Sequence, residues 1–147
     1  MMQDIKKILI ATDGSEQTRT AIERGVHLAK LLGAKVTALY VVEPIPLTNI
    51  PPDTSVVFSV HASLEDEGKK AVEEVKKLGD EHGVEVTTVV AEGSPEKKII
   101  ELSADHDLIV IGTLGRSGFS KLFMGSVAER VTRYAPVPVL VVRGKKS

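Results

Sequence analysis

The sequence predicts an α/β fold in which helices cover both faces of an open parallel sheet. Five short apolar segments alternate with four stretches of helical periodicity along the 147 residues, and this alternation is typical of right-handed β-α-β units. Several apolar segments are continuous runs of Val, Ile and Leu, as expected for strands that are buried on both faces. We expect one domain over residues 1–147, because this length suits a full-sized core.

The first part of the chain contains two predicted strands and one predicted helix. Residues 7–12 read Lys-Ile-Leu-Ile-Ala-Thr and form the first strand. Asp13 and the two residues after it interrupt the apolar run and supply helix-capping side chains. A helix is predicted over residues 16–32, where apolar side chains recur at helical spacing, and Gly33 ends it. Residues 35–42 form the second strand.

The segment from Glu43 to His61 departs from this regular alternation. It contains four of the seven prolines and has no clear period. It is also long for a connection in a compact domain, and such loops are often functional. We expect a loop here that serves as a lid or side wall of a site.

The remaining elements resume the alternation. One helix starts with a capping residue and a proline at its first position, Ser94-Pro95, which is a common pattern at helix N-termini. In order, the predicted elements are a helix over residues 62–82, a strand over 85–90, a helix from 94 to about 104, a strand over 108–111, a helix from about 125, and a strand over 137–142.

The last strand, from Val137 to Val142, is predicted to lie at an edge of the sheet. Pro136 and Pro138 cannot donate to a ladder, and we expect their missing donors to face outward. From Val139 onward the outer side would then be a free apolar edge, which favours pairing with another chain. The sequence therefore predicts a homodimer in which this strand pairs with its own copy. The alternative is that the proline-rich segment covers this edge.

Composition excludes several classes of function. Aromatic residues make up 3% of the chain, which argues against stacking platforms for single-stranded nucleic acid. The net charge of −1 provides no general attraction to nucleic acid or to an anionic membrane. The absence of cysteine excludes disulfides, iron–sulfur clusters and thiolate catalysis. We find no signal peptide and no apolar run that could span a bilayer, and we expect a cytoplasmic protein.

A glycine-rich stretch directly follows the strand over residues 108–111. It contains Gly112, Gly115 and Gly118, and Gly125 then precedes a predicted helix. Glycine lets backbone N–H groups approach a ligand closely, and a helix N-terminus adds donors and partial positive charge. The stretch and the turn at Asp13 both follow strand ends, where ligands bind in open α/β sheets. These features predict an anion site, most simply for phosphates.

Two common phosphate motifs do not account for this stretch. The sequence contains no G-x-x-x-x-G-K-[ST] motif. The dinucleotide fingerprint G-x-G-x-x-G is excluded because Gly112 and Gly115 are three residues apart. The observed spacing is Gly112-x2-Gly115-x9-Gly125-Ser126.

At these residues the chain closely resembles the universal stress protein family, in its ATP-binding branch, which carries G-x2-G-x9-G-[ST] after the fourth strand. The resemblance extends from Lys6 to Arg143. It includes the opening Ile-Leu-Ile-Ala-Thr-Asp-Gly-Ser, the second-strand ending Val-Val-Glu and the closing Ala-Pro-Val-Pro-Val-Leu-Val-Val-Arg. One departure is Ala11, where the family more often has proline.

The resemblance implies a Rossmann-like sheet of the adenine nucleotide alpha hydrolase type, with strand order 3-2-1-4-5. It also implies bound ATP, and it leaves room for Mg or Mn on the phosphates, although no acidic cluster in the sequence requires a metal. The residues implied at the nucleoside end are Ala11, Thr12, Asp13 and Val41. Those implied at the phosphates are Gly112, Thr113, Gly115, Arg116, Gly118, Gly125, Ser126 and Val127.

Several of these residues also have ordinary structural interpretations. Asp13 could cap the helix that follows it. Ser126 and Glu129 match a capping box, which satisfies some of the N–H groups that a phosphate would use. Arg116 could be an exposed loop residue. The four histidines show no metal-ligand spacing, and we expect them to be structural or on the surface.

Three hypotheses for function remain open at this point. The chain could be a nucleotide-responsive regulatory module of the stress response that holds ATP without rapid turnover. It could instead be a slow ATPase or nucleotidyl-transfer enzyme, or an interaction protein in which the nucleotide is a structural plug. A fast hydrolase needs a residue that positions water and an anchor for Mg²⁺, and we find neither in the glycine-rich stretch. This favours the regulatory module over the enzyme.

Overall fold

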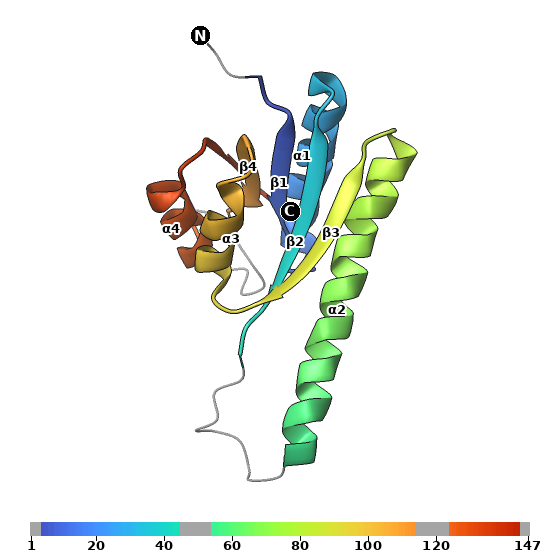
Figure 1. The fold of residues 1–147 in the computed structure, drawn as a ribbon, viewed down its shortest axis with the longest axis vertical. Helices are drawn as coiled ribbons and strands as arrows, with labels where there is room; N and C mark the ends of the chain where they lie inside the picture. The colour runs from blue at the N-terminus through green and yellow to red at the C-terminus, as the bar shows by residue number, and fades with distance from the viewer. Residues whose placement is uncertain (1–3, 45–53, 114–123, 145–147) are drawn as a thin grey trace.

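A computed structural model describes residues 4–44, 54–113 and 124–144 of the chain (Figure 1). Strands and helices alternate throughout, as predicted. The elements are β1 (Lys7–Ala11), α1 (Glu16–Leu32), β2 (Lys35–Val42), α2 (Thr54–Glu81), β3 (Val86–Glu92), α3 (Pro95–Ser103), β4 (Leu108–Gly112), α4 (Ser126–Tyr134) and β5 (Val139–Val142).

The five strands form one parallel sheet in the order β3-β2-β1-β4-β5. The predicted fold class and strand order are therefore confirmed. The winding direction reverses at β1, which pairs with β2 on one side and with β4 on the other. In open sheets of this kind, ligands bind in the crevice outside the carboxyl ends of the strands at the reversal point.

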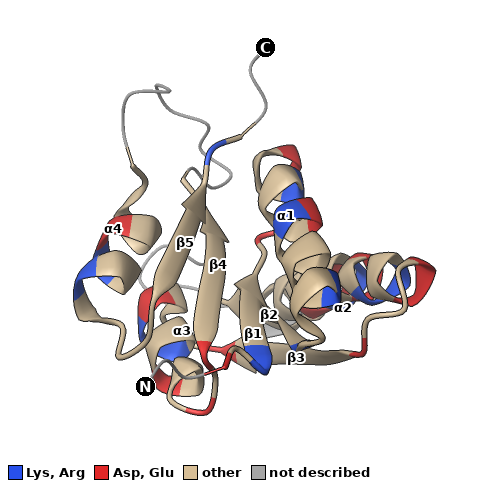
Figure 2. Ribbon diagram, turned by 90° about the horizontal axis from the view of Figure 1, so that it is seen from above, with Lys and Arg blue, Asp and Glu red and all other residues tan. Residues whose placement is uncertain are grey.

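Helices cover both faces of the sheet, and each face has its own apolar core. Alternate residues of a strand face opposite sides, so Ile8 and Ile10 face α1 and α2, whereas Leu9 faces the opposite layer with Ile99 of α3 and Val131 of α4. All five of these side chains are buried. Figure 2 shows the three layers and places most charged residues on the helices, while the central strands carry almost none. Within the described ranges, no helix is both long and apolar enough to cross a membrane.

Helix α2 begins eight residues earlier than predicted, at Thr54 rather than at residue 62. Its N-terminal part continues beyond the ends of the strands (Figure 1), and Val56, Phe58 and Val60 are exposed there. Valine and phenylalanine have modest helix propensity, so the local sequence favoured irregular structure. The predicted loop from Glu43 to His61 is therefore wrong for its second half, and residues 45–53 lie outside the described part of the chain.

Strand β5 lies at an edge of the sheet, as the prolines predicted. However, the prediction that they remove outward donors is wrong for Pro138. Its carbonyl oxygen accepts a hydrogen bond from the N–H of Ile109 at 3.0 Å, and the N and C=O of one strand residue point to the same side. Pro138 therefore faces β4, and it is tolerated because it lies directly before the strand, where the ladder only begins.

His106 connects α3 and β2 through its side chain. The side chain is buried; its Nδ1 lies 2.8 Å from the carbonyl oxygen of Leu102 and its Nε2 lies 2.7 Å from Oγ1 of Thr37. Since a carbonyl only accepts, Nδ1 carries a proton, and in the neutral ring Nε2 accepts from the threonine. This histidine has the structural role that was expected.

Asp107 joins the starts of β4 and β1. Its Oδ2 accepts hydrogen bonds from the backbone N–H of Lys6 at 2.9 Å and of Lys7 at 3.0 Å. These two bonds favour the ionised carboxylate and lower the pKa of Asp107 below its ordinary value of 3.8.

We predict that the stability contributed by Asp107 depends on pH. Because the folded pKa is lowered, the contribution is complete above the ordinary value and is lost as the pH falls through the lowered value. The protein should therefore be more stable than Asp107→Asn at pH 7, and the difference should shrink below about pH 4. Urea titrations from pH 7 to 2.5 measure this, with the exposed Asp105→Asn as control. A difference that stays constant over the whole range would contradict the prediction.

Candidate functional site

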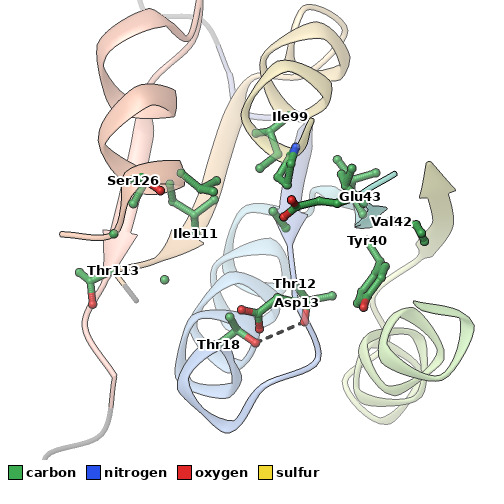
Figure 3. Close-up of a pocket in the computed structure, with 18 of the residues that line it drawn as sticks. Thr12, Asp13, Thr18, Tyr40, Val42, Glu43, Ile99, Ile111, Thr113 and Ser126 are labelled. Atoms are coloured by element: carbon green, nitrogen blue, oxygen red, sulfur yellow. Dashed lines mark hydrogen bonds between the residues drawn. The ribbon is translucent and has the colours of Figure 1, made fainter. Parts of the chain in front are cut away.

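A cavity of about 430 Å³ opens at the carboxyl ends of the strands, at the reversal point of the sheet. Its volume lies within the roughly 300–1,000 Å³ that ligand pockets occupy. It is bounded by β1, β2 and β4, by the N-terminal parts of α1, α3 and α4, and by Leu64 of α2 (Figure 3). The lining residues that the structure describes are Ala11, Thr12, Asp13, Thr18, Leu39, Tyr40, Val41, Val42, Glu43, Leu64, Pro95, Ile99, Ile111, Gly112, Thr113, Gly125, Ser126, Val127 and Ala128.

The turn after β1 is held by its own side chains. Oγ1 of Thr12 accepts from the N–H of Gly14 at 3.0 Å and lies 3.3 Å from Oγ1 of Thr18. Oδ1 of Asp13 accepts from the N–H of Ser15 at 2.9 Å and from its hydroxyl at 2.5 Å. Gly14 has φ of 78°, a conformation that glycine adopts without steric cost. The turn is therefore a fixed wall of the cavity, with Asp13 half-buried in it.

Ser15, rather than Asp13, is the N-cap residue of α1. The side chain of Asp13 bonds to the backbone N–H and the hydroxyl of Ser15, which precedes the helix. Through these two bonds Asp13 shapes the turn that leads into α1.

The opposite wall is built from the end of β4 and the start of α4. The N–H of Thr113 donates to the carbonyl of Val142 at 3.1 Å, and the N–H of Gly125 donates to the carbonyl of Thr113 at 2.6 Å. These bonds bring the two ends of the glycine-rich stretch together beside the cavity, although they are twelve residues apart in the sequence. Residues 114–123 between them lie outside the described part of the chain.

The capping box predicted at Ser126 does not form. Gly125 is the N-cap residue, and Ser126 is the first residue of the helix, so its hydroxyl does not cap the first turn. Glu129 pairs instead with Arg133 through a 3.0 Å contact. The N–H groups of Ser126, Val127 and Ala128 have no acceptor inside the helix, where bonding begins with Glu129 N–H to the Gly125 carbonyl. These three residues line the cavity, so its α4 end carries the positive pole of a helix.

The side wall next to α2 depends on a close approach between a helix and a strand. The ring of Tyr40 in β2 packs directly on Gly68 of α2, where a Cβ atom would lie only 2.7 Å from Cδ1 of the ring. Tyr40 is buried and lines the cavity together with Leu64, one helical turn before Gly68. Gly68 thus allows the tyrosine to stand between the core and the cavity.

The structure places nine of the twelve predicted site residues around this one cavity. They are Ala11, Thr12, Asp13, Val41, Gly112, Thr113, Gly125, Ser126 and Val127. The other three, Gly115, Arg116 and Gly118, lie outside the described residues. Among the lining residues that the sequence analysis missed, Glu43 directly follows a predicted strand, and this position could have indicated it. Leu64 and Ile99 belong to helices, and tertiary packing decides which face of each helix is turned toward the cavity. No local sequence pattern indicates that these two side chains line it.

The charged lining residues among those described are two acids, Asp13 and Glu43. Within the same part of the chain, no group of three or more His, Cys, Asp or Glu side chains is arranged to hold a metal ion. As far as the described residues show, the cavity is thus acidic at the ends of β1 and β2, without charged side chains but with backbone donors at α4, and mostly apolar between them.

Comparison with known proteins identifies relatives over nearly the whole chain. The model of the universal stress protein family matches residues 4–143. A universal stress protein of Methanocaldococcus jannaschii is 41% identical over 143 residues, which are 96% of this chain and 84% of the relative. A universal stress protein of Bacillus subtilis is 32% identical over 93% of this chain and 98% of the relative.

Solved structures share the same fold. The universal stress protein UspA from Lactobacillus plantarum has a TM-score of 0.86 and 25% identity, covering 97% of this chain and all of that one. Two further structures are similar at 21% and 19% identity, with TM-scores of 0.73 and 0.61. They are a universal stress protein in complex with cAMP, with coverage of 97% and 100%, and one from Archaeoglobus fulgidus in complex with dAMP, with coverage of 96% and 100%. At these identities the two complexes establish likeness of fold alone. The family match over residues 4–143, together with the two sequence relatives, shows that this chain belongs to the universal stress protein family.

Proposed function

We propose that this chain binds ATP in the cavity at the carboxyl ends of β1, β2 and β4, as a nucleotide-responsive regulatory module that hydrolyses ATP slowly or not at all. The carrying observation is the N-terminus of α4, which no side chain of the described residues caps and where Ser126, Val127 and Ala128 present backbone donors to the same cavity that Asp13 lines from β1. An anion at such a helix end is favoured by both the donors and the dipole.

The shape of the cavity supports a nucleotide rather than a free phosphate. Between the α4 end and the acidic end lie apolar side chains from three strands and α3, among them Val41, Ile99 and Ile111. A flat apolar base fits such walls, and the ribose can reach the polar turn at Asp13. Two universal stress proteins that share the fold were solved with adenine nucleotides, cAMP and dAMP. The glycine spacing of the chain, Gly112-x2-Gly115-x9-Gly125-Ser126, is that of the family's ATP-binding branch.

Mass spectrometry of the small molecules released from denatured protein tests this proposal, followed by calorimetric titration of ligand-free protein with ATP. We expect an adenine nucleotide to be released and ATP to bind with one site per chain. GTP should bind more weakly, because its base differs at the edge that would face the ends of β1 and β2. Purified protein that carries no nucleotide and takes up no ATP at millimolar concentration would refute the proposal.

The rate of hydrolysis separates the regulatory module from an enzyme on the same fold. We expect turnover well below the ~10 s⁻¹ of a typical enzyme, because the described lining residues offer no evident pair that would position water and anchor Mg²⁺. A phosphate-release assay on protein free of contaminating ATPases measures this. Multiple turnover at an ordinary enzymatic rate, lost when Gly125 is replaced by valine, would overturn the proposal of a regulatory module.

We also propose that the chain forms a homodimer through β5. The support is the position of this strand at the sheet edge and the direction of its backbone groups. Since Pro138 faces β4, alternation turns the N–H and C=O of Val139 and Val141 away from the sheet. All four residues of β5 are only partly buried. A second copy of this edge, related by a two-fold axis, is complementary to it.

A further inference from the structure

Glu43 occupies a fixed position at the mouth of the cavity. It directly follows β2, whose last residue, Val42, pairs with Glu92 of β3 and accepts a hydrogen bond from the N–H of Gly93 at 2.9 Å. The chain therefore leaves the sheet at a defined point. Figure 3 shows the carboxylate of Glu43 directed into the cavity, between Ile99 and Thr12.

The two carboxylates give the cavity an electrostatic direction. Asp13 and Glu43 are the charged groups among the described lining residues, and both lie at the end formed by β1 and β2. The other end has the N-terminus of α4 and the end of β4, with backbone donors and no described charge. An anionic group is attracted to the α4 end and repelled from the acidic end. A ligand with one charged and one neutral end is thus oriented by the cavity itself.

A carboxylate accepts hydrogen bonds and donates none. The neutral donors of an adenine nucleotide are the exocyclic amine of the base and the hydroxyls of the ribose. Both belong to the end of the ligand that lies away from the 5′-phosphates. We propose that Glu43 is a specificity-determining residue of this site: its carboxylate accepts a hydrogen bond from a neutral donor of the nucleoside and repels nucleotides that carry an additional phosphate on the ribose. This inference rests on the proposed nucleotide-binding function.

Two variants of Glu43 separate the hydrogen bond from the charge. Glu43→Gln keeps an acceptor oxygen but removes the charge, whereas Glu43→Ala removes both. The matched control is Glu92→Gln, which removes a carboxylate from the neighbouring strand end, where it contacts His61 at 3.3 Å and does not line the cavity. Circular dichroism before titration verifies that each variant is folded.

Calorimetry or ligand competition then compares six ligands with each protein. ATP is compared with purine riboside triphosphate, 2′-deoxy-ATP and 3′-deoxy-ATP, each of which lacks one donor. ADP is compared with adenosine 3′,5′-bisphosphate, which carries its second phosphate on the ribose. For the parent protein we expect ADP to bind at least about tenfold more tightly than the bisphosphate.

Each variant should change this pattern in a different way. Glu43→Gln should reduce the preference for ADP over the bisphosphate several-fold and bind ATP nearly as the parent does. Glu43→Ala should weaken ATP binding at least about tenfold, the scale of one lost hydrogen bond to a charged acceptor. It should also bind one of the three donor-lacking ligands as well as ATP, and that ligand identifies the group that Glu43 recognises. Glu92→Gln should leave every ratio unchanged.

The result that would overturn the inference is equally specific. If the parent binds ATP, but both Glu43 variants keep the parent's ligand ratios, Glu43 determines no specificity. Equal effects of Glu92→Gln and Glu43→Gln would also overturn it, because general surface charge would then explain both. Failure of the parent to bind any of the six ligands instead contradicts the proposed function, so the two failures are distinguishable.

Discussion

Replacing Ser126 by aspartate should weaken ATP binding at least about 100-fold while leaving the fold as stable as before, or more stable. Ser126 is the first residue of α4 and lines the cavity, and no side chain caps this helix in the described part of the chain. A carboxylate there interacts favourably with the helix dipole, by about 0.3–1 kcal/mol. It also occupies the region proposed for phosphate. Two unit charges about 4 Å apart repel by about 4 kcal/mol at an effective dielectric constant of 20, and 100-fold corresponds to about 2.8 kcal/mol.

Ser126→Asp should thus lower the affinity for ATP without lowering the stability of the ligand-free protein, so loss of binding cannot be attributed to unfolding. Thermal unfolding measures stability without ligand, and calorimetry measures ATP affinity. Ser126→Asn is the matched control, because it has nearly the same shape as aspartate without the charge, and it should cost less than about tenfold in affinity. If Ser126→Asp retains the parent's affinity in a folded protein, the phosphates do not lie at α4, and the proposed orientation of the ligand is wrong.

The fold could be predicted because its signals are local and repeated. The helix over residues 16–32 and the strand over residues 35–42 have the predicted bounds, since an apolar period, an N-terminal capping segment and Gly33 all agree there. Helix α2 was predicted too short because its first turns contain Val56, Phe58 and Val60. Those residues are poor local helix formers, and they belong to a helix whose remaining turns are fixed by packing on β2 and β3.

Part of the candidate site could be predicted because its residues follow strand ends. The turn at Asp13 and the glycine-rich stretch from Gly112 were found in this way, because parallel strands bring their carboxyl ends to one edge, whereas Val41 was implied by the family resemblance. Tyr40, Leu64 and Ile99 also line the cavity, but their inclusion depends on how α2 and α3 pack on the sheet. The small size of Gly68, which admits the Tyr40 ring, is visible in the sequence, but its partner is not.

The capping box at Ser126 illustrates why a motif alone was insufficient. The Ser-x-x-Glu pattern is present in the sequence, but Gly125 takes the N-cap position and Glu129 turns toward Arg133. A serine one position inside the helix has helical backbone angles, from which its hydroxyl does not reach the third residue's N–H. The Ser126 hydroxyl therefore does not cap the first turn of α4. This strengthens the proposal that a ligand accepts hydrogen bonds from the free N–H groups of that turn.

The direction of the β5 backbone decides which variant tests dimerisation. Leu140 pairs with Val110, and alternation from Pro138 points its N–H toward β4. Proline at position 140 would therefore disrupt the hydrogen bonding between β5 and β4 within one chain. Such a variant does not test whether the outer edge of β5 pairs with a second copy. Val141 points its N–H away from β4, so Val141→Pro removes an outward donor and leaves the inward bonds of its neighbours intact.

We expect Val141→Pro to convert a homodimer into a monomer. Sedimentation at tens of micromolar should give a dimer for the parent and a monomer for the variant, with little change in helix content. Val141 also packs against the core on the side of α3 and α4, so the variant should lose some stability.

Arg143→Pro removes the next outward donor from an exposed position, and it should weaken the dimer without this loss of stability. Leu140→Pro should instead lower the unfolding midpoint strongly, because it removes a bond within the chain. A parent that is monomeric at tens of micromolar, or a folded Val141→Pro variant that remains dimeric, would show that β5 does not form the interface.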